Sequence, residues 1–355
     1  MKNNNVIRSL VTFSLAIIFL FSVAGCTQKQ TTAPATPDKR NITDMAGRTV
    51  TLPAQINKAA TIGSVPVINS FVLALGEGEK IANNLPPDFQ KPRWKYQTVF
   101  APAMAGKPGL QGVNREPNIE ELLKASPDVI FTMNKESIDI MEKNGLNVVY
   151  LEWREPEDVK KAIMLVGEVL NKKAKAEEYI QYFDQTLKKV NTAVAGIPEE
   201  KRPKVLYCTV KTLSQPHLIA EWWIETAGGS SVTNDGRKVE SVSFSMEQML
   251  QWDPDVIIVN EPIELDQVYK DERFSKIKAV VNNRVFTTPV GAHIWAHRTI
   301  EQPLTVLWAA KTFYPEQFKD LDLEKEVQSF YERFFNYKMS QQEAKEILSG
   351  KQNLQ

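Results

Sequence analysis

One short pattern occurs twice in this chain and constrains its fold more than any other feature. It is NIEELLKASPDVIF at residues 118–131 and SMEQMLQWDPDVII at residues 245–258, and the copies align without a gap at a spacing of 127 residues (245 minus 118). Each copy combines an amphipathic helix, a Pro-Asp turn and an apolar run that suits a buried parallel strand. A helix that leads into such a strand is half of a β-α-β unit. The repeat therefore predicts two similar α/β lobes.

The stretch between the two copies predicts a helical connection. Apolar residues keep one face of a helix over residues 159–170 and one face of a second helix over residues 176–194, with a break near Asn171. A helix from about Ala174 to Ala195 would be roughly 33 Å long at about 1.5 Å per residue. We therefore expect a stiff rod that bridges both lobes.

Composition places the chain among globular proteins and excludes one class of partner. With 355 residues, 43% of them hydrophobic and 24% charged, it is long enough for two domains. Lysine plus arginine equals aspartate plus glutamate at 43 each. Because the net charge is zero, no global field would hold nucleic acid or an anionic membrane surface.

The N-terminus is typical of an export signal. Lys2 and Arg8 precede an apolar run over residues 10–24 that is too short for a stable membrane-spanning helix. The run ends on small residues before Cys26 and resembles the lipobox of bacterial lipoproteins, in which the cysteine becomes the lipid-bearing first residue. The alternative is a signal peptide followed by a chance cysteine. Residues 27–40 predict a flexible tether, so we expect an extracytoplasmic protein anchored to a membrane by lipid.

The inventory of reactive residues argues against an enzyme. Apart from Cys26 the chain has only Cys208, which lies in a strand-like run and is expected to be a small buried residue without a disulfide. With three histidines and no phosphate-binding loop, no set of nucleophile, base and orienting group is visible.

Ordered segments of the chain resemble periplasmic binding proteins for ferric siderophores, haem and cobalamin. The first segment is a strand over residues 59–62, a loop through Ser64 and a helix that stops at Gly76; the two repeat copies and residues 277–286 follow. The resemblance spans about residues 58–318. It implies an α/β fold with two lobes, each with a mainly parallel central sheet, joined by a long rigid helix and holding ligand in the cleft between them.

The expected division of the chain follows from these features. It is a signal peptide (1–25), a tether (26–40), an N-terminal lobe (41–172), a bridging helix (173–196), a C-terminal lobe (197–320) and a C-terminal helical segment (321–355) with an amphipathic helix over 321–337.

The resemblance implies ligand contacts in the loops that follow the strands. In this way it points to Ser64 in the first lobe and to Lys211 and His217 in the second. The long proline-rich stretch over residues 83–118 is a further source, because loops of such length are commonly functional. Its aromatic residues Trp94 and Tyr96 either line the cleft or pack the loop onto its own lobe.

The segment GAHIWAHRTIE at residues 291–301 carries the densest chemistry. Two histidines four residues apart could share a metal on a helix, but the glycine favours a loop and no third ligand is near, so we predict no metal site of protein side chains alone. The Arg298 guanidinium offers paired donors to carboxylate, phosphate or catecholate oxygens, or forms a salt bridge to Glu301. Trp295 and His297 could stack on a bound chelate or complete its coordination.

Glu120 and Glu247 occupy matching positions of the repeat. The field at a helix N-terminus favours a carboxylate there without any partner. The resemblance implies instead that the two acids dock into arginine pockets on the two permease subunits of an ABC importer.

Together these features predict a monomeric, lipid-anchored substrate-binding protein. It would capture a ferric siderophore, cobalamin, haem or similar metal chelate and deliver it to an ABC importer, with no intrinsic cofactor. The alternatives are a binding protein for a metal ion held directly by side chains and a surface lipoprotein without a transport role.

Overall fold

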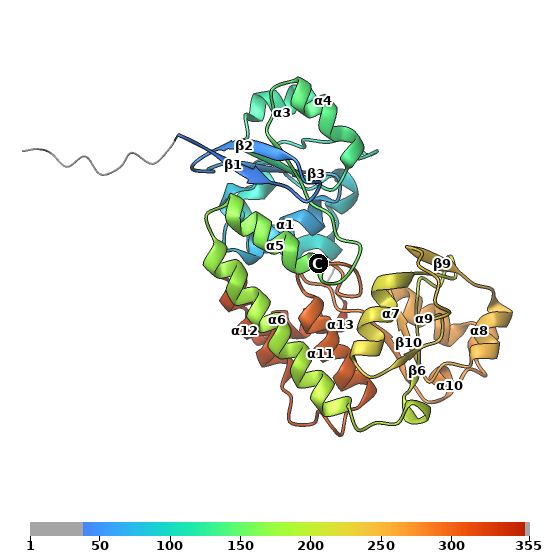
Figure 1. Ribbon diagram of the computed structural model, residues 1–355. Coiled ribbons are helices and arrows are strands. Elements are labelled where there is room, and N and C mark those ends of the chain that lie inside the picture. The colour runs from blue at the N-terminus through green and yellow to red at the C-terminus, as the bar shows by residue number, and fades with distance from the viewer. Residues whose placement is uncertain (1–37, 352–355) are drawn as a thin grey trace, which may run out of the picture. The chain divides into compact units, whose positions relative to one another are not determined.

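A computed structural model describes residues 38–351 of the chain (Figure 1). Cys26 and most of the predicted tether lie outside the described residues. Within the described part, no helix combines the length and the apolar character needed to cross a membrane.

The first lobe is built on a parallel sheet in the order β3-β4-β5. Its strands are β3 (Ala59–Ile62), β4 (Val129–Thr132) and β5 (Val148–Tyr150), and every residue in them is buried. Such continuous apolar runs are expected where helices cover both faces of a parallel sheet. Helix α1 (Val65–Ala74) lies on one face, whereas α3 (Ile119–Ala125) and α4 (Ile138–Lys143) lie on the other (Figure 1). A hairpin of β1 (Lys39–Thr43) and β2 (Thr49–Pro53) precedes this lobe.

The second lobe repeats this plan with a parallel sheet in the order β11-β10-β6-β8. Its strands are β6 (Lys204–Cys208), β8 (Ser230–Ser231), β10 (Val256–Val259) and β11 (Val285–Thr287). One face is covered by α8 (Met246–Trp252), α9 (Pro262–Lys270) and α10 (Lys278–Val281), the other by α7 (His217–Thr226). The segment between β6 and α7, where the resemblance implied a ligand-binding loop through Lys211, contains β7 (Ser214–Pro216), paired with β9 (Ser241–Ser243).

The sequence repeat becomes a structural repeat. Helices α3 and α8 both begin with a side-chain cap, from Asn118 and Ser245, and both end on a residue in the left-handed conformation. Asp128 and Asp255 then each accept a hydrogen bond from a backbone amide at the start of the neighbouring strand, from Lys58 directly before β3 and from Lys204, the first residue of β6. The repeated Pro-Asp turn thus fixes how each helix enters its sheet.

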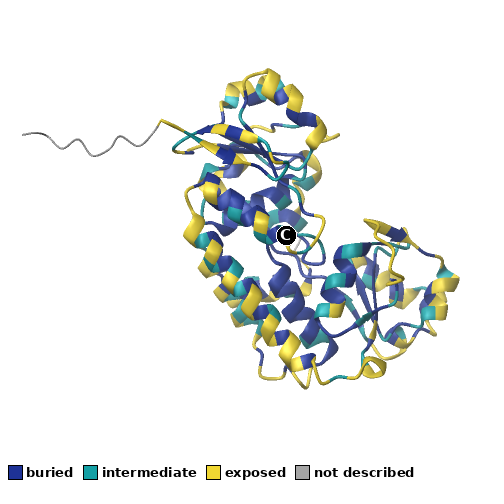
Figure 2. Cartoon of the chain, in the orientation of Figure 1, coloured by how far each residue is buried: buried dark blue, intermediate teal, exposed yellow. Residues whose placement is uncertain are grey.

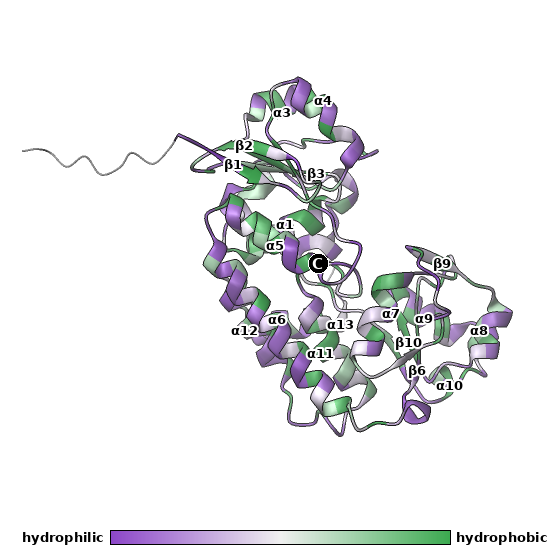
Figure 3. Ribbon diagram, in the orientation of Figure 1, coloured by the Kyte–Doolittle hydropathy of each residue, from purple (hydrophilic) through white to green (hydrophobic). Residues whose placement is uncertain are grey.

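Helices join the two lobes through one continuous hydrophobic core. They are α5 (Asp158–Val169), α6 (Lys173–Val194), α11 (Gln302–Phe313) and α12 (Leu323–Phe335). The long α6 runs beside α11, and its buried face packs into a core that reaches from β4 to β6 (Figure 2). Its outer face is hydrophilic (Figure 3). Between α5 and α6, Asn171 adopts a positive φ of 58°, so the helix axis breaks where the sequence predicted.

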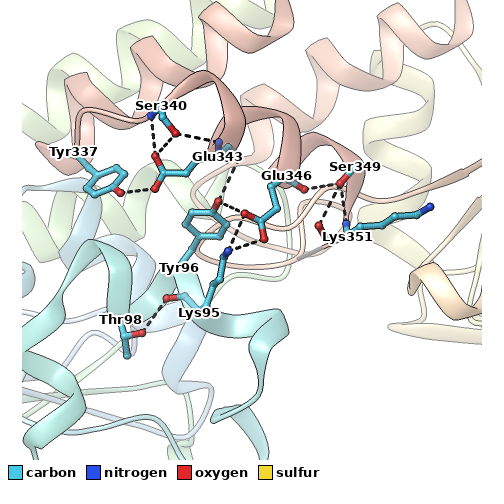
Figure 4. Close-up of polar contacts among 9 residues, drawn as sticks. All are labelled: Lys95, Tyr96, Thr98, Tyr337, Ser340, Glu343, Glu346, Ser349 and Lys351. Atoms are coloured by element: carbon cyan, nitrogen blue, oxygen red, sulfur yellow. Dashed lines mark hydrogen bonds and ion pairs between the residues drawn. The ribbon is translucent and has the colours of Figure 1, made fainter. Parts of the chain in front are cut away.

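Two helices add to the elements expected from the sequence. Residues 83–118 were expected to form a loop, but they contain α2 (Lys95–Phe100). The predicted C-terminal helical segment holds a second helix, α13 (Gln341–Ser349), after its amphipathic helix. These helices contact each other: Lys95 Nζ lies 2.6 Å from a carboxylate oxygen of Glu346, and Tyr96 Oη donates to the same carboxylate over 3.1 Å (Figure 4). The contact ties the C-terminal helix to the first lobe.

Candidate functional site

A cavity of about 420 Å³ lies between the two lobes, at the carboxyl ends of β3, β4 and β5. Ligands of open α/β sheets bind at this edge of the strands. The first lobe lines the cavity with Ser64, Pro66, Val67, Phe89, Arg115, Met133, Tyr150, Leu151, Glu152, Trp153 and Arg154. The second lobe and the loop after β11 contribute Pro216, Ile219, Glu240, His293, His297 and Arg298.

Glu301 holds the preceding loop in place through hydrogen bonds. We call this loop, residues 288–301, the histidine loop. This fully buried carboxylate accepts hydrogen bonds from the backbone amides of Ala292 (2.6 Å) and His293 (3.2 Å). It also accepts 2.6 Å hydrogen bonds from the hydroxyls of Thr299 and Tyr331. Burial raises the pKa of Glu301 to about 7, although these donors oppose the shift. The loop is therefore fixed by a buried polar network.

Gln97 of α2 connects this loop to the first lobe. Its side-chain amide donates to the carbonyl oxygens of Pro66 (2.8 Å) and Ala292 (2.5 Å), and its own oxygen accepts from Asn69 Nδ2 (3.0 Å). Because Pro66 lines the cavity and Ala292 precedes His293, one buried side chain sets the spacing of two cavity walls.

The arginines of the cavity differ in their pairing. Arg298 Nη1 lies 2.7 Å from Glu240 Oε2, and its guanidinium donates to the Arg154 carbonyl of the first lobe over 3.0 Å. The alternative salt bridge to Glu301 is wrong, because Glu301 is enclosed by the donors of its own loop. Arg154 pairs with Glu152 at 2.8 Å. The side chain of Arg115 makes no ion pair or hydrogen bond within residues 38–351.

The two cavity histidines are uncharged at neutral pH. Burial, and next the neighbouring His297, lower the pKa of His293 to about 3. Burial and the nearby positive charge of Arg93 lower the pKa of His297 to about 4. Their ring centroids are 5.6 Å apart. The cavity thus combines guanidinium groups with neutral imidazoles.

Three of the eight expected ligand residues line the cavity: Ser64, His297 and Arg298. Trp94 lies behind the wall, with its ring centroid 5.0 Å from that of His293 and 5.0 Å from that of Phe89. It therefore supports the cavity without lining it.

The other four expected residues lie elsewhere. Tyr96 is fully buried against α13 through its contact with Glu346. His217 is also fully buried, and its Nε2 lies 2.5 Å from a Glu221 oxygen and 3.0 Å from the Thr233 carbonyl. Trp295 is packed into the main core, and Lys211 is exposed in the turn after β6.

Several cavity residues were missed, and one sequence signal could have found some of them. Tyr150 is the last residue of β5, and Trp153 and Arg154 lie in the loop after it, at the edge where parallel strands present their ligand-binding loops. Arg115 and Glu240 lie in irregular segments without any such signal. Among residues 38–351, no group of three or more His, Cys, Asp or Glu side chains is arranged to hold a metal ion.

Comparison with known proteins shows the family to which this chain belongs. The family model of the periplasmic binding proteins matches residues 88–290, and the chain belongs to this family. It is the substrate-binding component of an ABC importer and acts outside the cytoplasm. The two-lobe α/β fold expected from the sequence is confirmed.

Individual relatives are similar to this protein over most of the length of its chain. The molybdate-binding protein MolA of Haemophilus influenzae is 26% identical over 332 residues, which cover 83% of this chain and 91% of MolA. A periplasmic solute binding protein from Veillonella parvula superimposes with a TM-score of 0.78 at 26% identity, covering 88% of this chain and 97% of the other. MolA bound to molybdate superimposes with a TM-score of 0.75 at 25% identity, covering 85% and 99%.

Proposed function

We propose that this protein captures an anionic metal chelate in the cavity between its lobes and delivers it to an ABC importer. The observation that carries the proposal is the combination of three arginines, two uncharged imidazoles and aromatic side chains around one cavity. Arginine supplies paired donors to carboxylate, phosphate or catecholate oxygens. Aromatic side chains such as Trp153 and Tyr150 supply flat apolar surface for an organic chelator.

The size of the cavity supports a chelate of moderate size. Small-molecule sites commonly have volumes of about 300 to 1,000 Å³, and 420 Å³ lies in the lower part of that range. At about 30 Å³ for each water-sized group, the cavity has room for a ligand considerably larger than a tetrahedral oxyanion.

A molybdate-like oxyanion is the second candidate. The similarity to MolA favours it, and so do the arginines of the cavity, above all Arg115 with its free guanidinium. The two imidazoles favour the chelate, because their low pKa values leave them without the positive charge that would attract an oxyanion. Direct capture of a bare metal ion has less support, since two imidazoles fall short of the four ligands of a closed protein site.

Analysis of the naturally bound ligand tests this proposal. The protein is purified from its own source without added ligand and denatured, and the released organic molecules and metals are identified by mass spectrometry. We expect a metal and its chelator in equal amounts, close to one per protein. Molybdate or tungstate without an organic component would overturn the chelate in favour of the oxyanion.

We further propose that lipid on Cys26 holds the protein at the membrane and that Glu120 and Glu247 contact the importer. Both acids are exposed at the second position of matched helices, one in each lobe. Two equivalent acids suit a partner with two-fold symmetry, one contact for each half. The oligomeric state we propose is a monomer.

A further inference from the structure

Arg93 belongs to the first lobe, but its guanidinium lies against the second. It is part of the short 3-10 helix Pro92–Trp94, directly before α2. Its Nη2 donates to the backbone carbonyl of Asn260 over 2.6 Å, and its Nη1 lies 3.3 Å from a carboxylate oxygen of Glu261. Asn260 directly follows β10, an inner strand of the second sheet. One side chain therefore connects the first lobe to the sheet edge of the second, and we call this contact the Arg93 bridge.

The acceptor of the Arg93 bridge has a fixed position in the second lobe. The Tyr207 hydroxyl of β6 donates to Oδ1 of Asn260 over 3.2 Å. The backbone amides of Asn260 and Glu261 donate to the carboxylate of Glu264 over 3.1 and 3.0 Å, and Glu264 is only 4% exposed. Because the side chain and the backbone of Asn260 both have partners within their own lobe, the carbonyl that accepts from Arg93 moves with that lobe.

The donor side of the bridge is held in the first lobe. Trp94, the residue after Arg93, packs between Phe89 and His293, with its ring centroid 5.0 Å from each of theirs. One helical turn further on, Gln97 donates to carbonyl oxygens of both cavity walls. Gln97 ends on the histidine loop, whereas Arg93 ends on the second sheet itself. The Arg93 bridge therefore sets a distance between the two lobes.

Arg298 crosses between the lobes in the opposite direction. It lies in the histidine loop and donates to the carbonyl of Arg154 in the first lobe over 3.0 Å. The two crossings differ in their relation to the cavity, because Arg298 lines it and Arg93 does not. A ligand that binds Arg298 competes with the Arg154 carbonyl for the same donors. The Arg93 bridge has no such competitor, so it is the crossing that persists when the cavity is occupied.

We propose that Arg93 is a positioning residue that holds the second lobe against the first and so fixes the width of the cavity before a ligand arrives. The inference goes beyond the proposed function, because it does not depend on which cargo the cavity takes. A ligand loses affinity in proportion to the fraction of protein that is not in the binding-competent state. By keeping the lobes at one spacing, Arg93 favours ligands of one size without contacting them.

The Arg93 bridge is separable from the stability of the fold. The side chain of Arg93 is 18% exposed, and its Nε is buried without a hydrogen-bonding partner within residues 38–351. Burial lowers the pKa of Arg93, although Glu261 opposes the shift. A buried charge that is incompletely paired adds little to stability, and an apolar side chain of similar volume is often tolerated in its place. Asn260 is half-buried and Glu261 is exposed, so water can replace the guanidinium at both acceptors.

The distance between the lobes tests the proposal in ligand-free protein. Lys143 of the first lobe and Lys276 of the second are exposed, and each is replaced by cysteine in the full chain to carry a spin label. Cys26→Ser prevents labelling at the N-terminus, and Cys208 is buried. Pulsed electron paramagnetic resonance then gives the distribution of distances between the two labels.

Arg93→Met should allow the lobes to separate, because it keeps the apolar stem of the side chain and removes its donors. The population at longer distances should rise at least about tenfold, as expected from truncation of a buried charged contact. Arg93→Gln, whose shorter side chain falls short of the carbonyl, should behave in the same way. Arg93→Lys should restore most of the wild-type distribution, since an ammonium can also donate to Asn260. Glu261→Gln should have a small effect, because exposed ion pairs contribute little.

Arg284→Met is the matched control. Arg284 also donates to backbone carbonyls, those of Thr312 and Phe313, but none of these residues belongs to the first lobe. This variant should keep the wild-type distribution of distances. A distribution that Arg93→Met and Arg93→Gln leave unchanged, or that Arg284→Met broadens equally, would overturn the proposal. Recovery of an oxyanion from the native protein would overturn the chelate as cargo and leave the role of Arg93 standing.

Discussion

The Tyr331 hydroxyl donates a 2.6 Å hydrogen bond to Glu301, a carboxylate without exposed surface. Tyr331 belongs to α12, whereas Glu301 ends the histidine loop, so this contact anchors the cavity wall to the helical core. Gly291 packs closely against this pair, since a Cβ at this position would lie 1.8 Å from the Tyr331 oxygen. The position of the two histidines therefore depends on a network that does not itself reach the cavity.

The raised pKa of Glu301 predicts a pH-dependent stability of the ligand-free protein. Burial raises the pKa of this carboxyl from 4.5 to about 7, so between these values the folded state retains a proton that the unfolded state has lost. This contribution is complete below pH 4.5 and is lost as the pH rises through about 7. Its size is on the order of 3 kcal/mol. Glu301→Gln should flatten this part of the dependence in denaturant unfolding measured from pH 5 to 8, and an unchanged slope would contradict the assignment.

Gln97→Leu should destabilise the protein without touching any ligand group. The change leaves the carbonyls of Pro66 and Ala292 without their donor, and a buried polar group that loses its partner costs about 1 to 3 kcal/mol. Gln90→Leu is the matched control, because Gln90 donates to a single carbonyl from an exposed position and should shift stability by less than about 0.5 kcal/mol. Urea unfolding measures both changes. If the two substitutions lowered the free energy of unfolding equally, Gln97 would have no special role in connecting the two cavity walls.

The sequence was sufficient for features that arise from local patterns. The strands appear as buried apolar runs, and the break between α5 and α6 follows a polar interruption near Asn171. His297 and Arg298 stood out because charged and aromatic residues gather in a loop after a strand. Each of these signals is carried by neighbouring residues alone.

Features that depend on distant partners were out of reach. Tyr96 does not line the cleft, because its hydroxyl donates a hydrogen bond to Glu346, which lies 250 residues further along the chain. Helix α13 has a short apolar stripe and is stabilised by its contact with α2, which was itself hidden in a proline-rich segment. Arg115 and Glu240 meet at one cavity only because the two lobes face each other. The residue pattern within a single segment carries no information about such long-range contacts.

The lipid anchor is tested on Cys26, which lies outside the described residues. We expect wild-type protein to take up a labelled fatty acid and to partition with membranes, because the short apolar run ends on Val23, Ala24 and Gly25 directly before this cysteine. Cys26→Ala should lose both properties. Label and membrane association retained by the variant would refute the lipobox.

Arg298→Ala should weaken ligand binding while the protein stays folded. Loss of a charged contact in a partly buried site costs about 2 to 5 kcal/mol of binding free energy, and Arg298 lines the cavity with only 16% of its side chain exposed. The control is Arg237→Ala, whose exposed arginine pairs with Asp235 outside the cavity. Tryptophan fluorescence with the ligand recovered from the protein measures affinity, and equal constants for Arg298→Ala and wild type would count against a contact.

The last prediction concerns the matched acids Glu120 and Glu247. Each stands in the first turn of its helix, where a carboxylate is favoured without any partner. Glu120 pairs with Lys124 at 2.8 Å, and hydrogen bonds from its own backbone amide and from Ser245 lower the pKa of Glu247. Local structure therefore gives each acid a favourable position, but it does not explain why acids occur at equivalent exposed sites of the two lobes. Only a role in docking makes them necessary for transport.

Replacing both acids by alanine should leave ligand affinity and melting temperature nearly unchanged, since both side chains are exposed. Stimulation of ATP hydrolysis by the reconstituted importer should be abolished, because each half of the importer loses its charged contact. Glu136→Ala combined with Glu272→Ala is the matched control, with one exposed acid removed from the first turn of a short helix in each lobe. If the Glu120 and Glu247 double variant supports normal transport into vesicles, or if the control pair is equally impaired, the two acids have no specific role in docking.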